Sequence, residues 1–195
     1  MEGFIYIAGS FENVNRSECG RGKGWIDNDP HFWSNPPTWG ICRPDLRERA
    51  QPGNYVFFVL PKNGRHPQCV FGYLRVEDKI SHLDAYRRSD LENKRMGNKN
   101  PNGNIIVDAS GAYNRFDGDV HRHNFSRIKR AYVIGSPATA RFLTATEIRR
   151  LAPSFLQTLR RVLRRDGPTP YDVISRYGSE LSERQIAELI DWIGT

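Results

Sequence analysis

The sequence is poor in cysteine, and the few cysteines it has do not form a recognisable pattern. Cys19, Cys42 and Cys69 are odd in number and widely spaced, and the 195 residues contain no Cys-x-x-Cys pair. A disulfide framework or a zinc ribbon would need paired cysteines at short spacing. We therefore expect reduced thiols in a cytoplasmic protein, with no metal ion and no cofactor.

Long apolar runs are also missing. The sequence has no stretch of roughly 20 consecutive apolar residues, which is the length a helix needs to cross a bilayer. A basic leader followed by an apolar segment, as in secreted proteins, is not found before the first expected strand at residues 4–8. These absences predict a cytoplasmic location and no membrane partner.

Acidic residues are outnumbered by basic ones. There are 22 Asp and Glu against 29 Lys and Arg, which gives a net charge of +7 at pH 7. An excess of this sign favours an anionic partner, nucleic acid first among them. Aromatic residues make up 11% of the chain, which is enough to build a core in one domain with an extension or in two small domains.

Apolar patterns and capping residues predict an α+β chain with strands first and helices last. Strands are expected at residues 4–8, 55–60, 69–76, 104–108 and 131–135. A helix is expected to open at Pro44, and another is expected over residues 81–96 with Ser81 and Asp84 as its capping pair. Further helices are expected to open at Pro153, just after a Thr144–Glu147 capping box, and at Ser182, which caps with Gln185. The strand at 55–60 is apolar on both faces, so we expect it in a core.

The motifs of the first 140 residues occur in an order that resembles the PUA-like superfamily, in particular the EVE, YTH and ASCH group. The nearest resemblance is to the nucleotide-modification-associated (Nmad) domains. It is carried by Thr38-Trp39-Gly40-Ile41-Cys42-Arg43, a basic helix from Pro44, Pro52-Gly53-Asn54 before a Phe-rich strand, Val70-Phe71-Gly72-Tyr73-Leu74, and Tyr132-Val133-Ile134-Gly135. Asn54 stands where those domains usually have aspartate.

The resemblance implies a PUA-like mixed β-barrel over residues 1–140, with a helical extension packed on it over residues 141–195. Such barrels accept a flipped or single-stranded base, often a modified one, in an aromatic pocket. Trp39 matches the position of a pocket aromatic, and Ser10 and Arg43 are candidates for contacts to the base edge and to phosphate. Trp33 and Asn35, in the preceding loop, are expected to line the mouth of the pocket.

The function predicted on this basis is recognition of a modified or flipped base in nucleic acid, linked to DNA modification or its detection. DNA is favoured over RNA as the partner, and a modified nucleotide is a second candidate ligand. The structural alternative for Trp39 is burial in the core, without any contact to a ligand.

A histidine-rich stretch supports an enzymatic alternative. If residues 117–123 are extended, Asp117, Asp119, His121 and His123 share one face of a strand. Carboxylates and imidazoles in that arrangement can hold a divalent metal or supply a general acid and base. In the enzymatic alternative, Asp119, His121 and His123 carry out nucleotide or base chemistry, with or without a metal. The simpler interpretation is an exposed polar hairpin tip.

The arginine-rich segment near the C-terminus permits a third interpretation. Between residues 153 and 165, apolar residues occupy one helical face, and the other face carries Arg160, Arg161, Arg164 and Arg165. A solvated helix face, contact with a nucleic-acid backbone and docking of an acidic protein partner are all compatible with this pattern.

Overall fold

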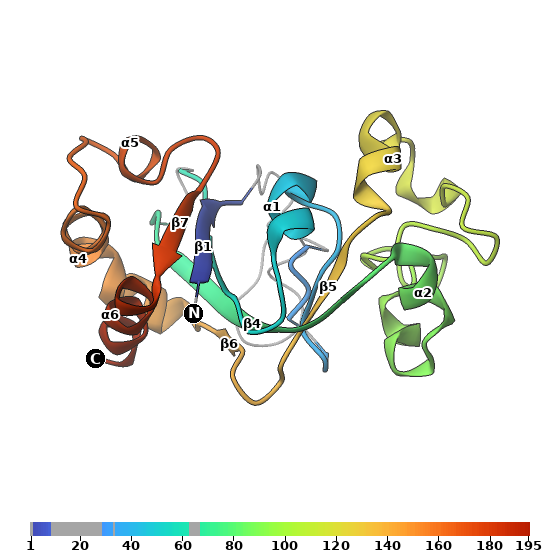
Figure 1. Ribbon diagram of the computed structural model, residues 1–195, viewed down its shortest axis with the longest axis horizontal. Coiled ribbons are helices and arrows are strands. Elements are labelled where there is room, and N and C mark those ends of the chain that lie inside the picture. Colours follow the sequence, from blue (N-terminus) through green and yellow to red (C-terminus); the bar gives the residue numbers. More distant parts are fainter. Residues whose placement is uncertain (1, 9–28, 33, 63–66) are drawn as a thin grey trace. The chain divides into compact units, whose positions relative to one another are not determined.

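The computed structural model describes residues 2–8, 29–32, 34–62 and 67–195 (Figure 1). The predictions for Ser10 and Trp33 therefore lie outside the described residues. Among the helices in the described part, none is long and apolar enough to cross a membrane.

The chain is α+β, as the sequence predicted. The strands of the described residues are β1 (Glu2–Ile7), β2 (Thr38–Trp39), β3 (Tyr55–Val59), β4 (Val70–Ile80), β5 (Tyr132–Gly135), β6 (Arg141–Phe142) and β7 (Ser179–Ser182). They form a mixed sheet in the order β2-β5-β4-β3-β1-β7, with β6 paired to β4. Within the described residues the strands at the two ends of this order, β2 and β7, do not pair with each other, so the sheet is open. Contacts divide the chain into two compact units, which strand β4 (Val70–Ile80) links by running through both.

The first unit comprises the described parts of Met1–Trp25, Gly53–Arg75 and Ala140–Thr195. Its strands are β1 (Glu2–Ile7), β3 (Tyr55–Val59), the beginning of β4, β6 (Arg141–Phe142) and β7 (Ser179–Ser182). Strands β1 and β3 pair in parallel, whereas the other pairs are antiparallel. Residues Val56 to Val59 of β3 are fully buried, which confirms the prediction of a core strand.

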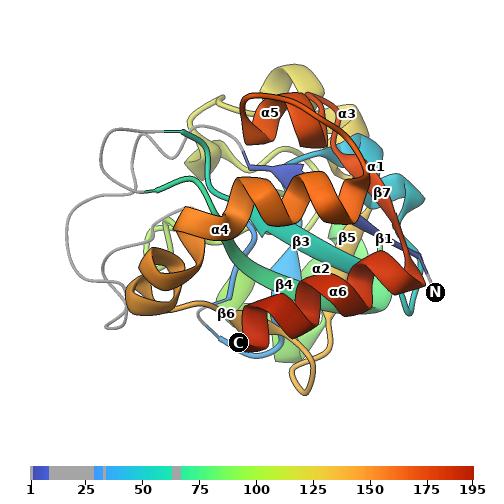
Figure 2. The same ribbon diagram turned by 90° about the vertical axis from the view of Figure 1, so that its left-hand side faces the viewer.

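Helices α4 (Ala145–Leu163), α5 (Pro170–Ile174) and α6 (Glu183–Gly194) complete the first unit (Figure 2). Helices α4 and α6 pack side by side, and the rings of Phe155 and Trp192 stack at a centroid distance of 5.7 Å. The prediction that a helix opens at Pro153 is wrong. The Thr144–Glu147 capping box starts α4 two turns earlier, and Pro153 lies inside it on the exposed side.

The second unit comprises the described parts of Ile26–Pro52 and Val76–Thr139. It contains β2 (Thr38–Trp39), α1 (Pro44–Arg49), the end of β4, α2 (His82–Arg87), α3 (Phe125–Ile128) and β5 (Tyr132–Gly135). Three short 3₁₀ turns also belong to it: η1 (Ser89–Lys94), η2 (Arg115–Asp117) and η3 (Arg122–Asn124). Much of this unit is irregular chain between short elements.

Two predicted elements of the second unit are corrected. The helix expected over residues 81–96 keeps its predicted Ser81–Asp84 cap but breaks at Arg88, whose backbone is extended and whose guanidinium binds Asp78 and Asp90. The strand expected at 104–108 forms only isolated bridges, of Ile105 with Arg95 and of Val107 with Tyr113. Its apolar residues are buried, but its backbone pairs with irregular chain instead of a strand.

Candidate nucleic-acid interface

The structure places the Trp39-Gly40 motif in a buried part of the second unit. Trp39 pairs with Val133 across β2 and β5 and has no exposed surface. No side chain fits at position 40, because a Cβ atom there would lie 2.6 Å from the Tyr132 ring and 2.7 Å from the carbonyl oxygen of Asn104. Close packing of backbone against an aromatic ring therefore explains the glycine.

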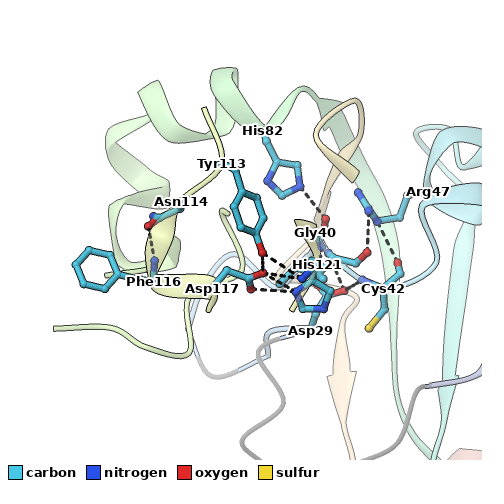
Figure 3. Close-up of polar contacts among 11 residues, drawn as sticks. Asp29, Gly40, Cys42, Arg47, His82, Tyr113, Asn114, Phe116, Asp117 and His121 are labelled. Carbon is cyan, nitrogen blue, oxygen red and sulfur yellow. Dashed lines mark hydrogen bonds and ion pairs between the residues drawn. The ribbon is translucent and has the colours of Figure 1, made fainter. Parts of the chain in front are cut away.

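A buried carboxylate organises the chain that follows Trp39. Asp29 accepts hydrogen bonds from the backbone N–H groups of Gly40 (2.5 Å), Ile41 (2.8 Å) and Cys42 (Figure 3). The Asn104 amide donates a further hydrogen bond to the same carboxylate at 3.1 Å. Burial raises the pKa of Asp29, and the nearby Arg47 guanidinium and these backbone donors oppose that rise.

Two further buried side chains hold the same stretch from its carbonyl side. The Arg47 guanidinium donates to the carbonyl oxygens of Cys42 (3.0 Å), Ile41 (2.9 Å), Ile128 (3.2 Å) and Ala131. His82 Nε2 lies 2.7 Å from the Gly40 carbonyl oxygen (Figure 3) and must carry the proton there, because a carbonyl only accepts. Burial lowers the pKa of His82 to about 3, so its ring is neutral.

These contacts show what the remaining residues predicted around Trp39 do. Arg43 adopts a left-handed conformation (φ 51°) ahead of α1, and its guanidinium binds the Asp45 carboxylate at 2.5 Å and 2.9 Å. Asn35 is exposed. The stretch from Trp39 to Arg43 is thus held by side chains that sequence reasoning missed, because Asp29, His82 and Asn104 are single polar residues without a local motif.

The histidine-rich stretch is not extended, which corrects the prediction of one face shared by Asp117, Asp119, His121 and His123. It is built of the turns η2 and η3, and Asp119 has a left-handed backbone (φ 64°). Asp119 and His123 are both exposed, and the Asp119 carboxylate binds the Arg122 guanidinium at 2.6 Å. The structure therefore brings His121 together with Asp117, at helical spacing, instead of with Asp119 and His123.

Asp117 and His121 form an oriented pair (Figure 3). His121 Nδ1 lies 2.9 Å from Asp117 Oδ1, and the Tyr113 hydroxyl donates to Asp117 Oδ2. Although burial acts in the opposite direction, the hydrogen bonds from His121 and Tyr113 hold the pKa of Asp117 below its usual value. Burial and the bond to Asp117 raise the pKa of Tyr113 to about 12. The carboxylate thus keeps a proton on Nδ1 and leaves Nε2 as the open nitrogen.

Exposed basic and aromatic side chains surround this pair along residues 113–130, which we call the basic-aromatic segment. It holds five Lys or Arg against two Asp. Phe116 is 40% exposed and Val120 is 64% exposed, although both are large apolar residues. The Arg115 guanidinium lies 5.1 Å from the centre of the Phe116 ring, and Arg122 lies 4.9 Å from that of Tyr113.

The positive charges of the basic-aromatic segment are only partly neutralised. Asp119 binds Arg122, and the single carboxylate of Glu48, in α1, is shared between Arg127 (3.7 Å) and Arg130 (3.8 Å). Arg115 and Lys129 contact aromatic rings but no carboxylate among the described residues. An exposed ring beside cations is what single-stranded nucleic acid requires, because bases stack on rings and phosphates bind cations.

Comparison with known proteins adds no relative. No known protein family, no curated protein sequence and no solved structure matches the chain.

Proposed function

We propose that this chain binds nucleic acid through the basic-aromatic segment, with Phe116 as the platform on which a base stacks. The observation that carries the proposal is the exposure of the Phe116 ring beside the Arg115 guanidinium. A ring that is exposed beside a cation suits a ligand that has both a flat aromatic face and a negative charge. A base and its phosphate make such a ligand.

The preferred target in this proposal is a modified or flipped base, in DNA rather than RNA. Support comes from the motif resemblance of residues 38–74 to the nucleotide-modification-associated domains and to the PUA-like barrels. We place the stacking contact at Phe116 instead of Trp39 because Trp39 has no exposed surface in the described structure. In this arrangement Trp39 supports the chain that carries Asp29 and Arg47.

The proposal is tested by fluorescence anisotropy with labelled single-stranded DNA, plain or carrying modified cytosine or thymine, at two salt concentrations. Phe116→Ala should weaken binding about 5- to 150-fold, which corresponds to the 1–3 kcal/mol of a stacked base. Tyr177→Ala is the matched control, because Tyr177 is an aromatic residue of the first unit that is 73% exposed.

Equal affinity of the wild type and Phe116→Ala would contradict stacking at this ring. Binding that disappears at the higher salt concentration for every oligonucleotide alike would reduce the interaction to phosphate attraction. Tighter binding to one modified oligonucleotide, lost in Phe116→Ala, would support recognition of the modification.

A second candidate function is hydrolysis or modification of a nucleotide, with His121 as general base. The Asp117–His121 geometry favours it, because a carboxylate on Nδ1 orients the ring and leaves Nε2 to accept a proton from water or a hydroxyl group. His121→Ala and Asp117→Asn should then both abolish turnover of a labelled oligonucleotide, whereas His123→Ala should retain it. Turnover that persists in His121→Ala would exclude this role.

A further inference from the structure

A second positively charged site lies in the first unit, between the end of α4 and the beginning of α6. There a cavity of about 540 Å³ is lined by Arg161, Arg164, Ser182, Arg184, Gln185 and Glu188, among others. The two helices pack side by side (Figure 2), so the cavity is bounded by regular elements that contact each other. It shares no residue with the basic-aromatic segment.

The lining of this cavity has an excess of positive charge. Three arginines face one carboxylate, and that carboxylate, Glu188, is bound by Arg184 at 2.8 Å one helical turn away. Arg161 and Arg164 therefore lack a counter-charge within the lining. Proximity to the C-terminal end of α4 stabilises both cations by a few tenths of a kcal/mol to about 1 kcal/mol, but it accounts for neither the cavity nor their position on its wall.

The four arginines at the C-terminal end of α4 and directly after it fall into two pairs with different tasks. Arg160 donates twice to the Gly167 carbonyl oxygen, at 2.7 Å and 3.0 Å, and Arg165 donates to Ser179 Oγ at 2.9 Å. These two hold the connection to α5 and β7. By contrast, Arg161 and Arg164 line the cavity and form no hydrogen bond or ion pair through their side chains with any described residue.

The opposite wall of the cavity is formed by the beginning of α6. Ser182 caps the twelve-residue helix α6, and the Gln185 side chain accepts from Ser182 and donates to the Val162 carbonyl oxygen at 2.8 Å, which ties α6 to α4. The N-terminal end of α6, with its partial positive charge, thus stands at the same cavity as Arg161 and Arg164.

From this juxtaposition we infer that the cavity binds the phosphate group of a small molecule, with Arg161 and Arg164 as its ligands. Arginine donors match phosphate oxygens in geometry and charge. A volume of about 540 Å³ exceeds what inorganic phosphate needs and lies within the range of small-molecule sites. The site is independent of nucleic-acid binding by the basic-aromatic segment.

Isothermal titration calorimetry with ADP, inorganic phosphate and adenosine tests the inference on the full chain. We expect saturable binding of ADP at one site, weaker binding of phosphate, and none of adenosine. Arg161→Gln with Arg164→Gln should weaken ADP binding at least tenfold. Arg149→Gln with Arg150→Gln is the matched control: both residues are exposed on α4, outside the cavity lining, and the change in net charge is the same.

Several outcomes would overturn the inference. These are no saturable binding of ADP or phosphate, adenosine binding as tightly as ADP, or an equal loss of affinity in both double variants. Circular dichroism melts of the variants establish that each is folded at the titration temperature. Because Phe116 lies in the other unit, ADP binding retained in Phe116→Ala would separate this site from the proposed nucleic-acid interface.

Discussion

The two compact units bury different kinds of side chain. In the first unit the buried described residues are almost all apolar, with Thr158 and Ser179 as the buried polar ones. The second unit buries charged and titratable groups as well: Asp29, His31, Arg47, His82, Lys94 and Asp117. Both units hold cores, but the interactions that stabilise them differ.

The difference follows from the regularity of the backbone. Strands and long helices satisfy their own N–H and C=O groups, so the first unit can fill its interior with apolar side chains. The second unit contains much irregular chain, whose buried backbone groups need partners from side chains. The Asp29 carboxylate accepts hydrogen bonds from three backbone N–H groups, and the Arg47 guanidinium donates hydrogen bonds to four carbonyl oxygens.

The comparison predicts its largest effect at Arg47. Arg47→Met should lower the free energy of unfolding by about 3–5 kcal/mol, because it leaves four carbonyl oxygens and the Asp29 carboxylate without their buried cation. Urea denaturation measures this loss. Arg49→Met, an exposed change in the same helix, should alter stability by less than about 0.5 kcal/mol, and equal effects would mean that the buried cation is not special.

In the first unit the matching change is apolar. Leu159→Ala removes a fully buried side chain from α4 and should cost about 2–5 kcal/mol through lost burial and a residual cavity. The substitution removes only apolar atoms. We therefore expect the loss of unfolding free energy to be the same at pH 5.5 and pH 7. A cost that changes strongly between the two would contradict the apolar character of this core.

The pH dependence of stability should distinguish the two units more clearly than any single truncation of a side chain. Burial lowers the pKa of His31 and of His82 to about 3, from 6.5, so the unfolded state binds more protons between these values. Stability is therefore lost as the pH falls below 6.5, by about 1.4 kcal/mol per pH unit and histidine. Unfolding measured between pH 6.5 and 4.5 tests this slope.

Substitution of one buried histidine shows how much of the change of stability with pH comes from that residue. His82→Gln should remove about 1.4 kcal/mol per pH unit from the slope, whereas Ser126→Ala, an exposed change at a residue that does not titrate, should leave it unaltered. Lys94 does not contribute in this range. Burial lowers its pKa to about 7, so it is protonated in both states below that pH and adds stability only as the pH rises from 7 towards 10.5.

The smallest predicted effect is local to the start of α4. Thr144→Ala removes the side-chain cap of the Glu147 N–H and half of the capping box, which should cost about 1 kcal/mol. Thr146→Ala, exposed within the first turn of the same helix, is the control. A loss of equal size in both variants would mean that the cap itself contributes nothing.

The caps show which parts of the fold could be predicted from sequence. Ser81 with Asp84, Thr144 with Glu147 and Ser182 with Gln185 all cap as predicted, because each pair acts within one turn of chain. Pro153 and the run 104–108 were misread, since a proline is tolerated on an exposed helix face and an apolar run can be buried without a strand partner. At the candidate site, the sequence identified His121 but paired it with the wrong carboxylate.

By itself, the sequence determined what depends on neighbours along the chain: the α+β class, the core strand at 55–60, the capped helices and the positive charge. The tertiary structure alone decided which distant groups meet. It brought Asp29, His82 and Asn104 to the chain after Trp39, exposed Phe116, and separated Arg161 and Arg164 from Arg160 and Arg165. The physical reason is that a polar side chain finds its partner through space, and residue spacing records only partners within a turn or along a strand.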